Sequence, residues 1–232
     1  MRTWNVFHGN ALPPRRTGFL RRMIELVTAD RPDVVCLQEL PVWALQRIDG
    51  WSGMTCFGAT ARRPVGIGTV SAWITRTNQG LFRSGLAGQA NAILVTPSRS
   101  AEDLGSERIS DAHRERRIVH AVRLLGRPSV VVANLHATND FGDPDVPRRE
   151  AARARDVVDR LAGAGEPVVL AGDFNVADPQ LAGFSAPAGG IDHVLVRGAL
   201  PLSVSVWPAE RRTVDGIVLS DHAPAECLVE LP

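Results

Sequence analysis

The chain has 232 residues, of which 44% are hydrophobic and 22% charged, a composition typical of one globular α/β or β-rich domain. Its 26 basic and 25 acidic residues nearly cancel, so the net charge indicates neither a nucleic-acid surface nor a membrane surface. Every basic residue is an arginine and tyrosine is absent, which excludes lysine Schiff bases, Walker-type lysines and tyrosine nucleophiles.

Short apolar runs rich in β-branched residues predict at least nine strands along the chain. Apolar residues spaced three and four apart predict helices from Gly18 to Ala29 and from Pro147 to Ala162, and a weaker pattern predicts a third helix after Pro41. The charged stretch from Ser98 to His113 is typical of a surface loop. The predicted strands are Thr3–Phe7, Val34–Leu37, Ile67–Ile74, Ala92–Val95, Ile118–Leu124, Val130–Leu135, Val168–Ala171, His193–Val196 and Cys227–Leu231.

The order of these elements favours one fold class. Strands outnumber helices and do not alternate strictly with them, so two packed sheets with helices outside fit better than a doubly wound parallel sheet. No linker, internal repeat or low-complexity block divides the chain. We therefore expect a layered α/β sandwich that forms a single domain over residues 1–232.

The first residues, MRTWNVFHGN, contain no apolar stretch of signal-peptide length, and no later run reaches the roughly eighteen apolar residues of a membrane span. The three cysteines are widely spaced and odd in number, and Cys36 and Cys227 lie in apolar runs, which indicates buried reduced thiols. We expect a cytoplasmic monomer without stable membrane association.

Polar residues that suit chemistry recur at the ends of the predicted strands, where rigid backbone can direct side chains into one cleft. This placement occurs six times, so six strand ends could converge on one site. The residues are Asn5, Gln38 with Glu39, His136, Asp173 with Asn175, Asp192, and Asp221 with His222.

Each of these residues also has a structural explanation when taken alone. Asp173 could be a turn aspartate in AGDFN, and Glu39 could be a carboxylate at a helix entry. His136 could be a core histidine, and Asp221 could cap the turn before Pro224. Their joint occurrence favours the functional interpretation.

The chemistry of the set points to one reaction class. Carboxylates and amides are hard oxygen ligands, and no Cys/His cluster has zinc spacing, so the set favours Mg²⁺ or Mn²⁺. Phosphoester hydrolysis needs a cation for the phosphate, a base for water and fixed donors for the developing charge. The set supplies the base, the donors and the ligands for such a cation.

Six motifs in order resemble the endonuclease/exonuclease/phosphatase superfamily, the group of DNase I, AP endonucleases, inositol polyphosphate 5-phosphatases and bacterial sphingomyelinases. The motifs are TWNV, PDVVCLQE, ANLHAT, LAGDFN, GIDHVLV and LSDHAP, and they cover nearly the whole chain. The resemblance implies a DNase I-like fold, a four-layered α/β sandwich in which two mixed β-sheets pack face to face with helices outside. It also implies a Mg²⁺-dependent phosphoester hydrolase.

The resemblance assigns a metal group and a catalytic group. Glu39 binds the catalytic Mg²⁺, Asn5 helps to ligate or orient it, and Asp221 completes the metal environment. Asp173 orients and deprotonates the attacking water, and Asn175 holds the phosphate or that aspartate.

The remaining assigned residues are the histidines and a carboxylate. His222 donates to a phosphoryl oxygen, and Asp192 pairs with it, which raises the pKa of the imidazole. His136 contacts the phosphate or assists the leaving oxygen. DNase I-like members support this histidine with a carboxylate, but the stretch from Pro64 to Gly80, where we would expect it, contains no Asp or Glu.

We expect a phosphodiesterase with nuclease-type activity on DNA or RNA, and the alternative is hydrolysis of a smaller phosphoester. A nuclease acting on DNA or RNA would use arginine clusters to bind phosphates, although acidic neighbours also allow a solvated surface. A smaller phosphoester, such as a phospholipid headgroup, sugar phosphate or nucleotide, suits the near-neutral charge and the short segment between Asn175 and Asp192. Trp43, Trp51 and Trp73 could line such a site or pack in the core. The clusters contain Arg15, Arg16, Arg21, Arg22, Arg114, Arg116, Arg117, Arg148, Arg149, Arg153, Arg211 and Arg212.

A non-catalytic binding module of the same fold is the third hypothesis, ranked last because the carboxylates and both histidines stand in their motifs. The other histidines, His8, His113, His120 and His193, are left out of the catalytic set together with Asn10. Alternation along its strand places His193 on the face opposite to Asp192.

Overall fold

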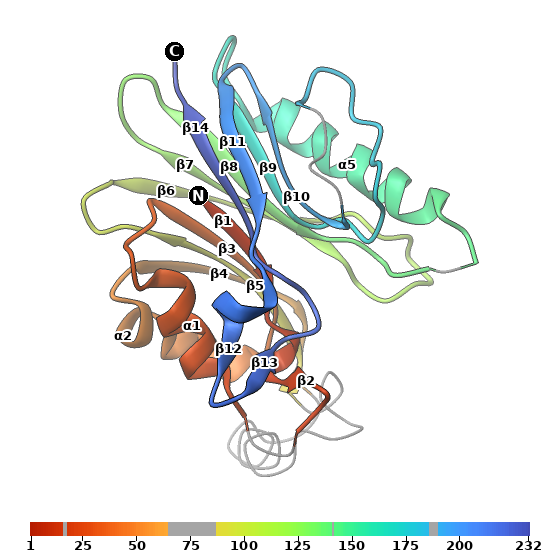
Figure 1. The fold of residues 1–232 in the computed structure, drawn as a ribbon. Coiled ribbons are helices and arrows are strands. Elements are labelled where there is room, and N and C mark those ends of the chain that lie inside the picture. The colour runs from red at the N-terminus through yellow and green to blue at the C-terminus, as the bar shows by residue number, and fades with distance from the viewer. Residues whose placement is uncertain (16–17, 65–86, 141, 186–189) are drawn as a thin grey trace.

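Two β-sheets lie face to face at the centre of the computed structural model, which describes residues 1–15, 18–64, 87–140, 142–185 and 190–232 (Figure 1). The six-stranded sheet has the order β11 (Leu200–Val206), β14 (Ala225–Glu230), β1 (Arg2–Asn5), β3 (Val34–Leu40), β5 (Gln89–Val95) and β4 (Thr55–Arg62). The five-stranded sheet has the order β10 (Asp192–Arg197), β9 (Val168–Asp173), β8 (Val130–His136), β7 (Ile118–Leu124) and β6 (Ala101–Arg108).

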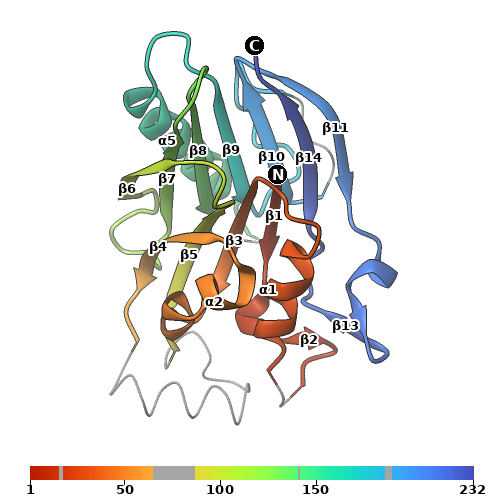
Figure 2. The ribbon, with the colours of Figure 1, turned by 90° about the vertical axis from the view of Figure 1, so that its left-hand side faces the viewer.

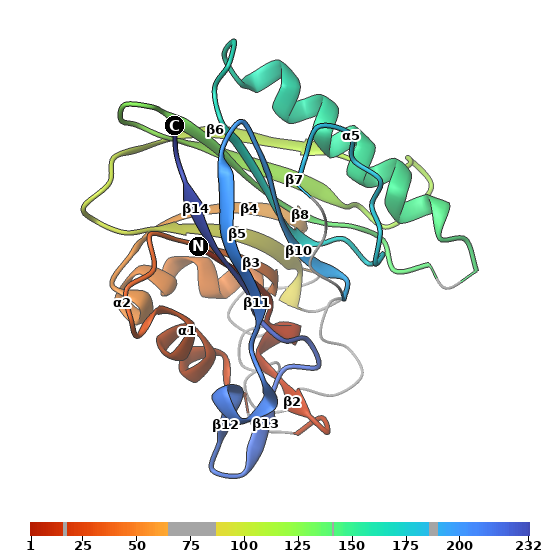
Figure 3. The same ribbon diagram turned by 45° about the horizontal axis from the view of Figure 1, so that its top comes forward.

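Helices cover the outer face of each sheet (Figure 3). On the six-stranded sheet lie α1 (Leu20–Thr28), the 3-10 helix η2 (Val42–Gln46) and α2 (Ile48–Ser52). On the five-stranded sheet lies α5 (Asp145–Leu161), which buries Ala151, Ala154 and Val158. Helix, sheet, sheet and helix form four layers, and the predicted sandwich is confirmed.

A small three-stranded sheet extends from one end of the six-stranded sheet (Figure 2). It contains β2 (Ala11–Leu12), β12 (Thr213–Val214) and β13 (Ile217–Leu219), with the 3-10 helices η1 (Phe7–Gly9) and η3 (Ala209–Arg212) beside it in sequence. It joins the chain that follows β1 to the chain that precedes β14. The segments around Asn5 and around Asp221 are therefore tied together.

The space between the two large sheets is mostly apolar, and a few polar side chains link the sheets across it. Cys36 and Ile93 from one sheet pack in the same cluster as Val132 from the other. Gln38 crosses the gap, since its Nε2 donates to Asn134 Oδ1 at 2.7 Å. Gln38, one of the polar residues at the predicted strand ends, therefore joins the sheets.

Most predicted elements are present, and most of the strands are longer than predicted, whereas β1 and α1 are shorter. The predicted strand Ile67–Ile74 lies outside the described residues. The prediction of a surface loop from Ser98 to His113 is wrong in its central part, because Ala101–Arg108 forms β6 and pairs antiparallel with β7. This edge strand is charged and largely exposed, so it lacks the alternation of apolar residues that indicates a strand.

The cysteines are free thiols, with Cys36 and Cys227 buried and Cys56 half-buried. Within the part of the chain that the structure describes, none of the helices has the length and apolar character needed to cross a membrane.

Candidate active site

The topology brings the predicted strand ends to one edge of the sandwich. Strands β1 and β3 are parallel, as are β8 and β9, so Asn5, Glu39, His136 and Asp173 lie at or near the carboxyl ends of parallel strands. The register pairs Asp173 with His136 on one side and with Asp192 on the other. The expected convergence is therefore observed.

The turn before β14 reaches the same edge, because β14 runs antiparallel to β1. Ser220 connects this turn to β1, since its hydroxyl donates to Asn5 O at 2.7 Å and accepts from His222 N at 3.1 Å. Trp4 Nε1 donates to His222 O at 3.0 Å. These contacts fix the backbone of His222 relative to Asn5.

Asp173 lies at the centre of the site, and its side chain is 1% exposed. Asn5 Nδ2 donates to Oδ2 at 2.9 Å, and the Asn175 backbone N–H donates to Oδ1 at 3.0 Å. Burial, reinforced by the charge of Asp192, raises the pKa of Asp173 to about 7. A carboxylate with this pKa can exchange a proton near neutral pH.

His222 forms a charged pair with Asp192. Its Nδ1 donates to Asp192 Oδ2 at 2.8 Å, and its Nε2 lies 3.8 Å from Asp173 Oδ2. Burial opposes the imidazolium, but the hydrogen bond and charge of Asp192 outweigh it and raise the pKa of His222 to about 9. The ring therefore presents Nε2–H to the site at neutral pH.

His136 has a different environment, made by two residues that the sequence interpretation did not assign. Gln89 Nε2 lies 3.1 Å from Nδ1, and Arg117 Nη1 lies 3.0 and 3.1 Å from the two ring nitrogens. Gln89 Nε2 donates to Nδ1, and Nε2 faces the carboxylate of Asp173 at 3.5 Å, so the proton of the neutral ring is on Nε2. Burial, together with the positive charge of Arg117, lowers the pKa of His136 well below its ordinary value.

The neutral ring of His136 can donate one hydrogen bond into the site from Nε2, which lies 3.5 Å from Asp173 Oδ2. This arrangement supports contact with the phosphate rather than proton delivery to the leaving oxygen. Arg117 belonged to one of the predicted arginine clusters. Only its position directly before the apolar strand β7 could have indicated that its side chain points inward. Gln89 had no sequence signal.

Asn175 supports the site mainly through its backbone. Its N–H holds Asp173, while its side-chain Nδ2 donates to Ala137 O at 2.9 Å. Of the two roles expected for Asn175, this geometry favours the one in which it holds the aspartate. Gly172, just before Asp173, has a φ of +143°, and a Cβ there would lie 2.0 Å from Leu135 O.

Glu39 and Asp221 supply carboxylate oxygens beside Asn5. Burial raises the pKa of Glu39, the Arg117 charge and an Asn5 hydrogen bond offset part of this, and the negative charge of Asp221 adds to it. Its oxygens lie 3.8 Å from His8 Nε2 and from His136 Nε2. A half-buried carboxylate with an amide and the charge of a second carboxylate nearby fits the oxygen donors that Mg²⁺ takes.

A second group of possible ligands overlaps the catalytic residues. Ligand atoms of Asp173, Asp192 and His222 lie within 4.8 Å of one another. A His222 ring that is protonated and bonded to Asp192 has no lone pair for a cation, so we interpret this group as a hydrogen-bonded relay. The metal group of Asn5, Glu39 and Asp221 remains a prediction.

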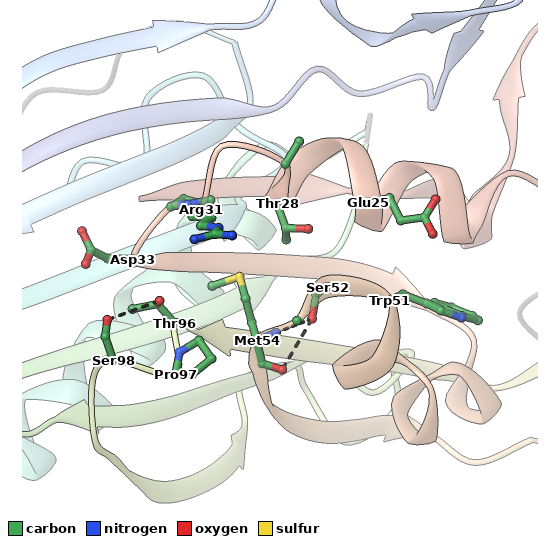
Figure 4. Close-up of a pocket in the computed structure, with 13 residues that line it drawn as sticks. Glu25, Thr28, Arg31, Asp33, Trp51, Ser52, Met54, Thr96, Pro97 and Ser98 are labelled. Carbon is green, nitrogen blue, oxygen red and sulfur yellow. Dashed lines mark hydrogen bonds between the residues drawn. The ribbon is translucent and has the colours of Figure 1, made fainter.

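A cleft of about 770 Å³ lies at the opposite end of the six-stranded sheet (Figure 4). It is lined by the end of α1, by α2 and by the turn between β5 and β6. Asp33, which precedes β3, lines it, whereas Glu39 lies near the other end of that strand. None of the predicted catalytic or metal residues lines this cleft, whereas Trp51, which could have lined the substrate site, does.

The family model described as the endonuclease/exonuclease/phosphatase family matches residues 3–222. The chain belongs to this family. Its members hydrolyse phosphoesters, and all the predicted catalytic and metal residues, from Asn5 to His222, lie within the matched region. No curated protein sequence matches the chain.

Solved structures of the same family share the fold at low sequence identity. Truncated Caenorhabditis elegans TDP2 is 15% identical with a TM-score of 0.68, over 100% of this chain and 96% of that one. A Bacteroides thetaiotaomicron mannosyl-6-phosphatase is 17% identical with a TM-score of 0.66, over 98% of both chains. A functionally unknown conserved protein from Enterococcus faecalis is 16% identical with a TM-score of 0.70, over 100% of both chains. These likenesses establish the DNase I-like sandwich.

Proposed function

We propose that the protein is a Mg²⁺-dependent phosphoester hydrolase in which Asp173 activates the attacking water. The observation that carries this proposal is the position of Asp173 Oδ2, which is hydrogen-bonded to Asn5 and faces both site imidazoles. Two hydrogen bonds hold the carboxylate in one orientation, and burial gives it a pKa of about 7. Asp173 can therefore accept a proton from water near neutral pH.

Two donors face the position of the phosphoryl oxygens from opposite sides of Asp173. His222, protonated through Asp192, donates from Nε2, and neutral His136 donates from its own Nε2. A cationic and a neutral donor fixed in a buried site stabilise charge that develops on phosphoryl oxygens. Asn5, Glu39 and Asp221 would hold Mg²⁺ or Mn²⁺, which supplies further charge neutralisation when bound.

The surface favours a small phosphoester over nucleic acid. Most of the clustered arginines that the structure describes form ion pairs with carboxylates of the same chain, for example Arg114 with Asp140 and Arg153 with Asp111, each at 2.7 Å. A guanidinium group that is already ion-paired neutralises less phosphate charge, so its contact with a nucleic acid releases fewer of the counterions bound to the phosphates. Further pairs are Arg21–Glu25, Arg22–Asp215, Arg148–Asp145, Arg149–Asp143 and Arg211–Asp30.

Two residues named for substrate binding, Arg16 and Trp73, lie outside the described residues. An activity assay tests the nuclease hypothesis directly. Purified protein with Mg²⁺ or Mn²⁺ is given bis-(p-nitrophenyl) phosphate, p-nitrophenyl phosphate and supercoiled plasmid, beside EDTA and Asp173→Asn controls. We expect release of nitrophenol that both controls abolish, with the plasmid left intact. Nicking that both controls abolish would establish a nuclease, and inactivity on every ester would favour the non-catalytic binding module.

A further inference from the structure

His193 contacts the residues on both sides of Asn175. Its Nε2 lies 2.9 Å from Val176 O, and its ring meets Phe174 edge-on with centroids 5.2 Å apart and an interplanar angle of 69°. The imidazole is fully buried, so these contacts are formed away from solvent. As predicted, its side chain lies apart from the Asp192–His222 pair.

The backbone conformation of Asn175 decides where its N–H points. Its φ is +51°, in the left-handed region that asparagine adopts more readily than other residues with a side chain. The conformation turns the Asn175 N–H toward Asp173 Oδ1, at 3.0 Å. Any relaxation of this residue would release one of the two hydrogen bonds that orient the proposed base.

We propose that His193 is a positioning residue that holds Asn175 in this conformation by fixing Phe174 and Val176. The inference rests on the proposed function, because it assigns His193 a role in the orientation of Asp173. Val176 O can only accept, so His193 carries its proton on Nε2. Nδ1 is buried and has no partner among the described residues, consistent with a neutral ring that makes one anchoring hydrogen bond.

Two substitutions separate the contacts of His193. His193→Phe keeps an aromatic ring against Phe174 but removes the donor to Val176 O. His193→Gln keeps an N–H donor at a similar reach but removes the ring. We expect His193→Phe to lower kcat on bis-(p-nitrophenyl) phosphate by about 10- to 100-fold with little change in KM, and His193→Gln to restore much of the loss.

A double-mutant cycle with Asn175→Ala tests whether His193 acts through Asn175. Alanine keeps the backbone N–H but adopts the left-handed conformation less readily than asparagine, so if His193 acts by holding that conformation, His193→Phe lowers kcat strongly in the wild-type background and little in the Asn175→Ala background. Wild-type kcat in His193→Phe, or losses that multiply independently in the double variant, would overturn the proposal. His120→Phe is the matched control, because His120 is also buried and contacts none of these residues; it should lower Tm without lowering kcat.

Hydrogen exchange gives a readout that does not depend on activity. In His193→Phe the amides of residues 174–176 should exchange faster than in the wild type, while those of the β9 core should not. Unchanged exchange in this segment would contradict the anchoring role. If the wild-type protein hydrolyses no ester, the proposed function fails, and the exchange rates still decide whether His193 holds the segment.

Discussion

Asn5 and Asp173 are 168 positions apart in the sequence, and one hydrogen bond joins them across the two sheets, with Nδ2 donating to Oδ2 at 2.9 Å. Asn5 ends β1 of the six-stranded sheet and Asp173 ends β9 of the five-stranded sheet. The proposed metal group lies on the Asn5 side of this bond and the proposed base lies on the other. The relative position of metal and base therefore depends on how the two sheets pack.

Asp173→Asn should abolish most turnover while the protein stays folded. Asparagine keeps the shape of the side chain but cannot accept a proton from water, so we expect kcat to fall by about 10²- to 10⁴-fold. Stability should hold or rise, because the buried carboxylate of Asp173 faces that of Asp192. The measurement is kcat on bis-(p-nitrophenyl) phosphate beside a thermal melt, and unchanged turnover would refute the assignment of the base.

Arg117→Lys tests whether the guanidinium of Arg117 positions His136. A lysine keeps the charge but has no planar guanidinium, so it cannot reach both ring nitrogens and Glu115 together. Loss of a charged hydrogen bond of about 1.5–3 kcal/mol corresponds to a roughly 10- to 100-fold lower kcat/KM. Arg116→Lys is the control, because Arg116 is exposed on the preceding position. Equal activity of the two variants would exclude a role for Arg117 in the reaction.

The sequence indicates the residues whose place in the site follows from strand topology alone. Asp173 and His136 each end an apolar strand, and parallel strands bring such ends to one edge. Gln89 and Arg117 could not be found in this way, because Gln89 begins β5 of the other sheet and Arg117 directly precedes β7, the antiparallel neighbour of β8, so neither ends an apolar strand. Edge strands such as β6 are also hard to predict. Solvent contacts much of the strand, so its sequence lacks the row of apolar residues that a buried face would require.

Glu39→Gln should remove the stabilisation that Mg²⁺ gives the wild-type protein. A cation that binds only the folded state raises Tm, and the loss of a carboxylate ligand should weaken binding by at least about tenfold. Without Mg²⁺ the variant should be as stable as the wild type or more so, because the raised pKa of Glu39 shows that its buried charge is unfavourable. Thermal melts across a Mg²⁺ titration measure both effects.

Glu107→Gln is the control for Glu39→Gln, because Glu107 is exposed on β6 and pairs with Arg160 at 2.7 Å. Its Mg²⁺ response should equal that of the wild type. If Mg²⁺ raises Tm of Glu39→Gln as much as that of the wild type, the cation binds elsewhere and the proposed ligand group is wrong.

His120 should make the protein less stable as the pH falls below about 6.5, the ordinary pKa of histidine. Burial lowers the pKa of His120, and the hydrogen bond to Asp103 offsets only part of this, so the folded state binds a proton less readily than the unfolded state. The contribution of His120 is complete above the unfolded pKa and is lost as the pH falls toward the folded pKa. The pKa of Asp103 is also lowered, but its contribution is lost only below about pH 4.

The test compares the free energy of unfolding of His120→Gln and wild type by urea denaturation between pH 7.5 and pH 5, a range set by the ordinary histidine pKa of about 6.5. Glutamine keeps a donor for Asp103 but does not titrate, so the decline of stability with falling pH should be shallower by at most about 1.4 kcal/mol per pH unit. His113→Gln replaces an exposed histidine and is the control variant, for which the free energy of unfolding should depend on pH as in the wild type. If the free energy of unfolding of His120→Gln falls with pH as steeply as that of the wild type, His120 binds a proton equally well in the folded and unfolded states. Its burial would then have no electrostatic cost.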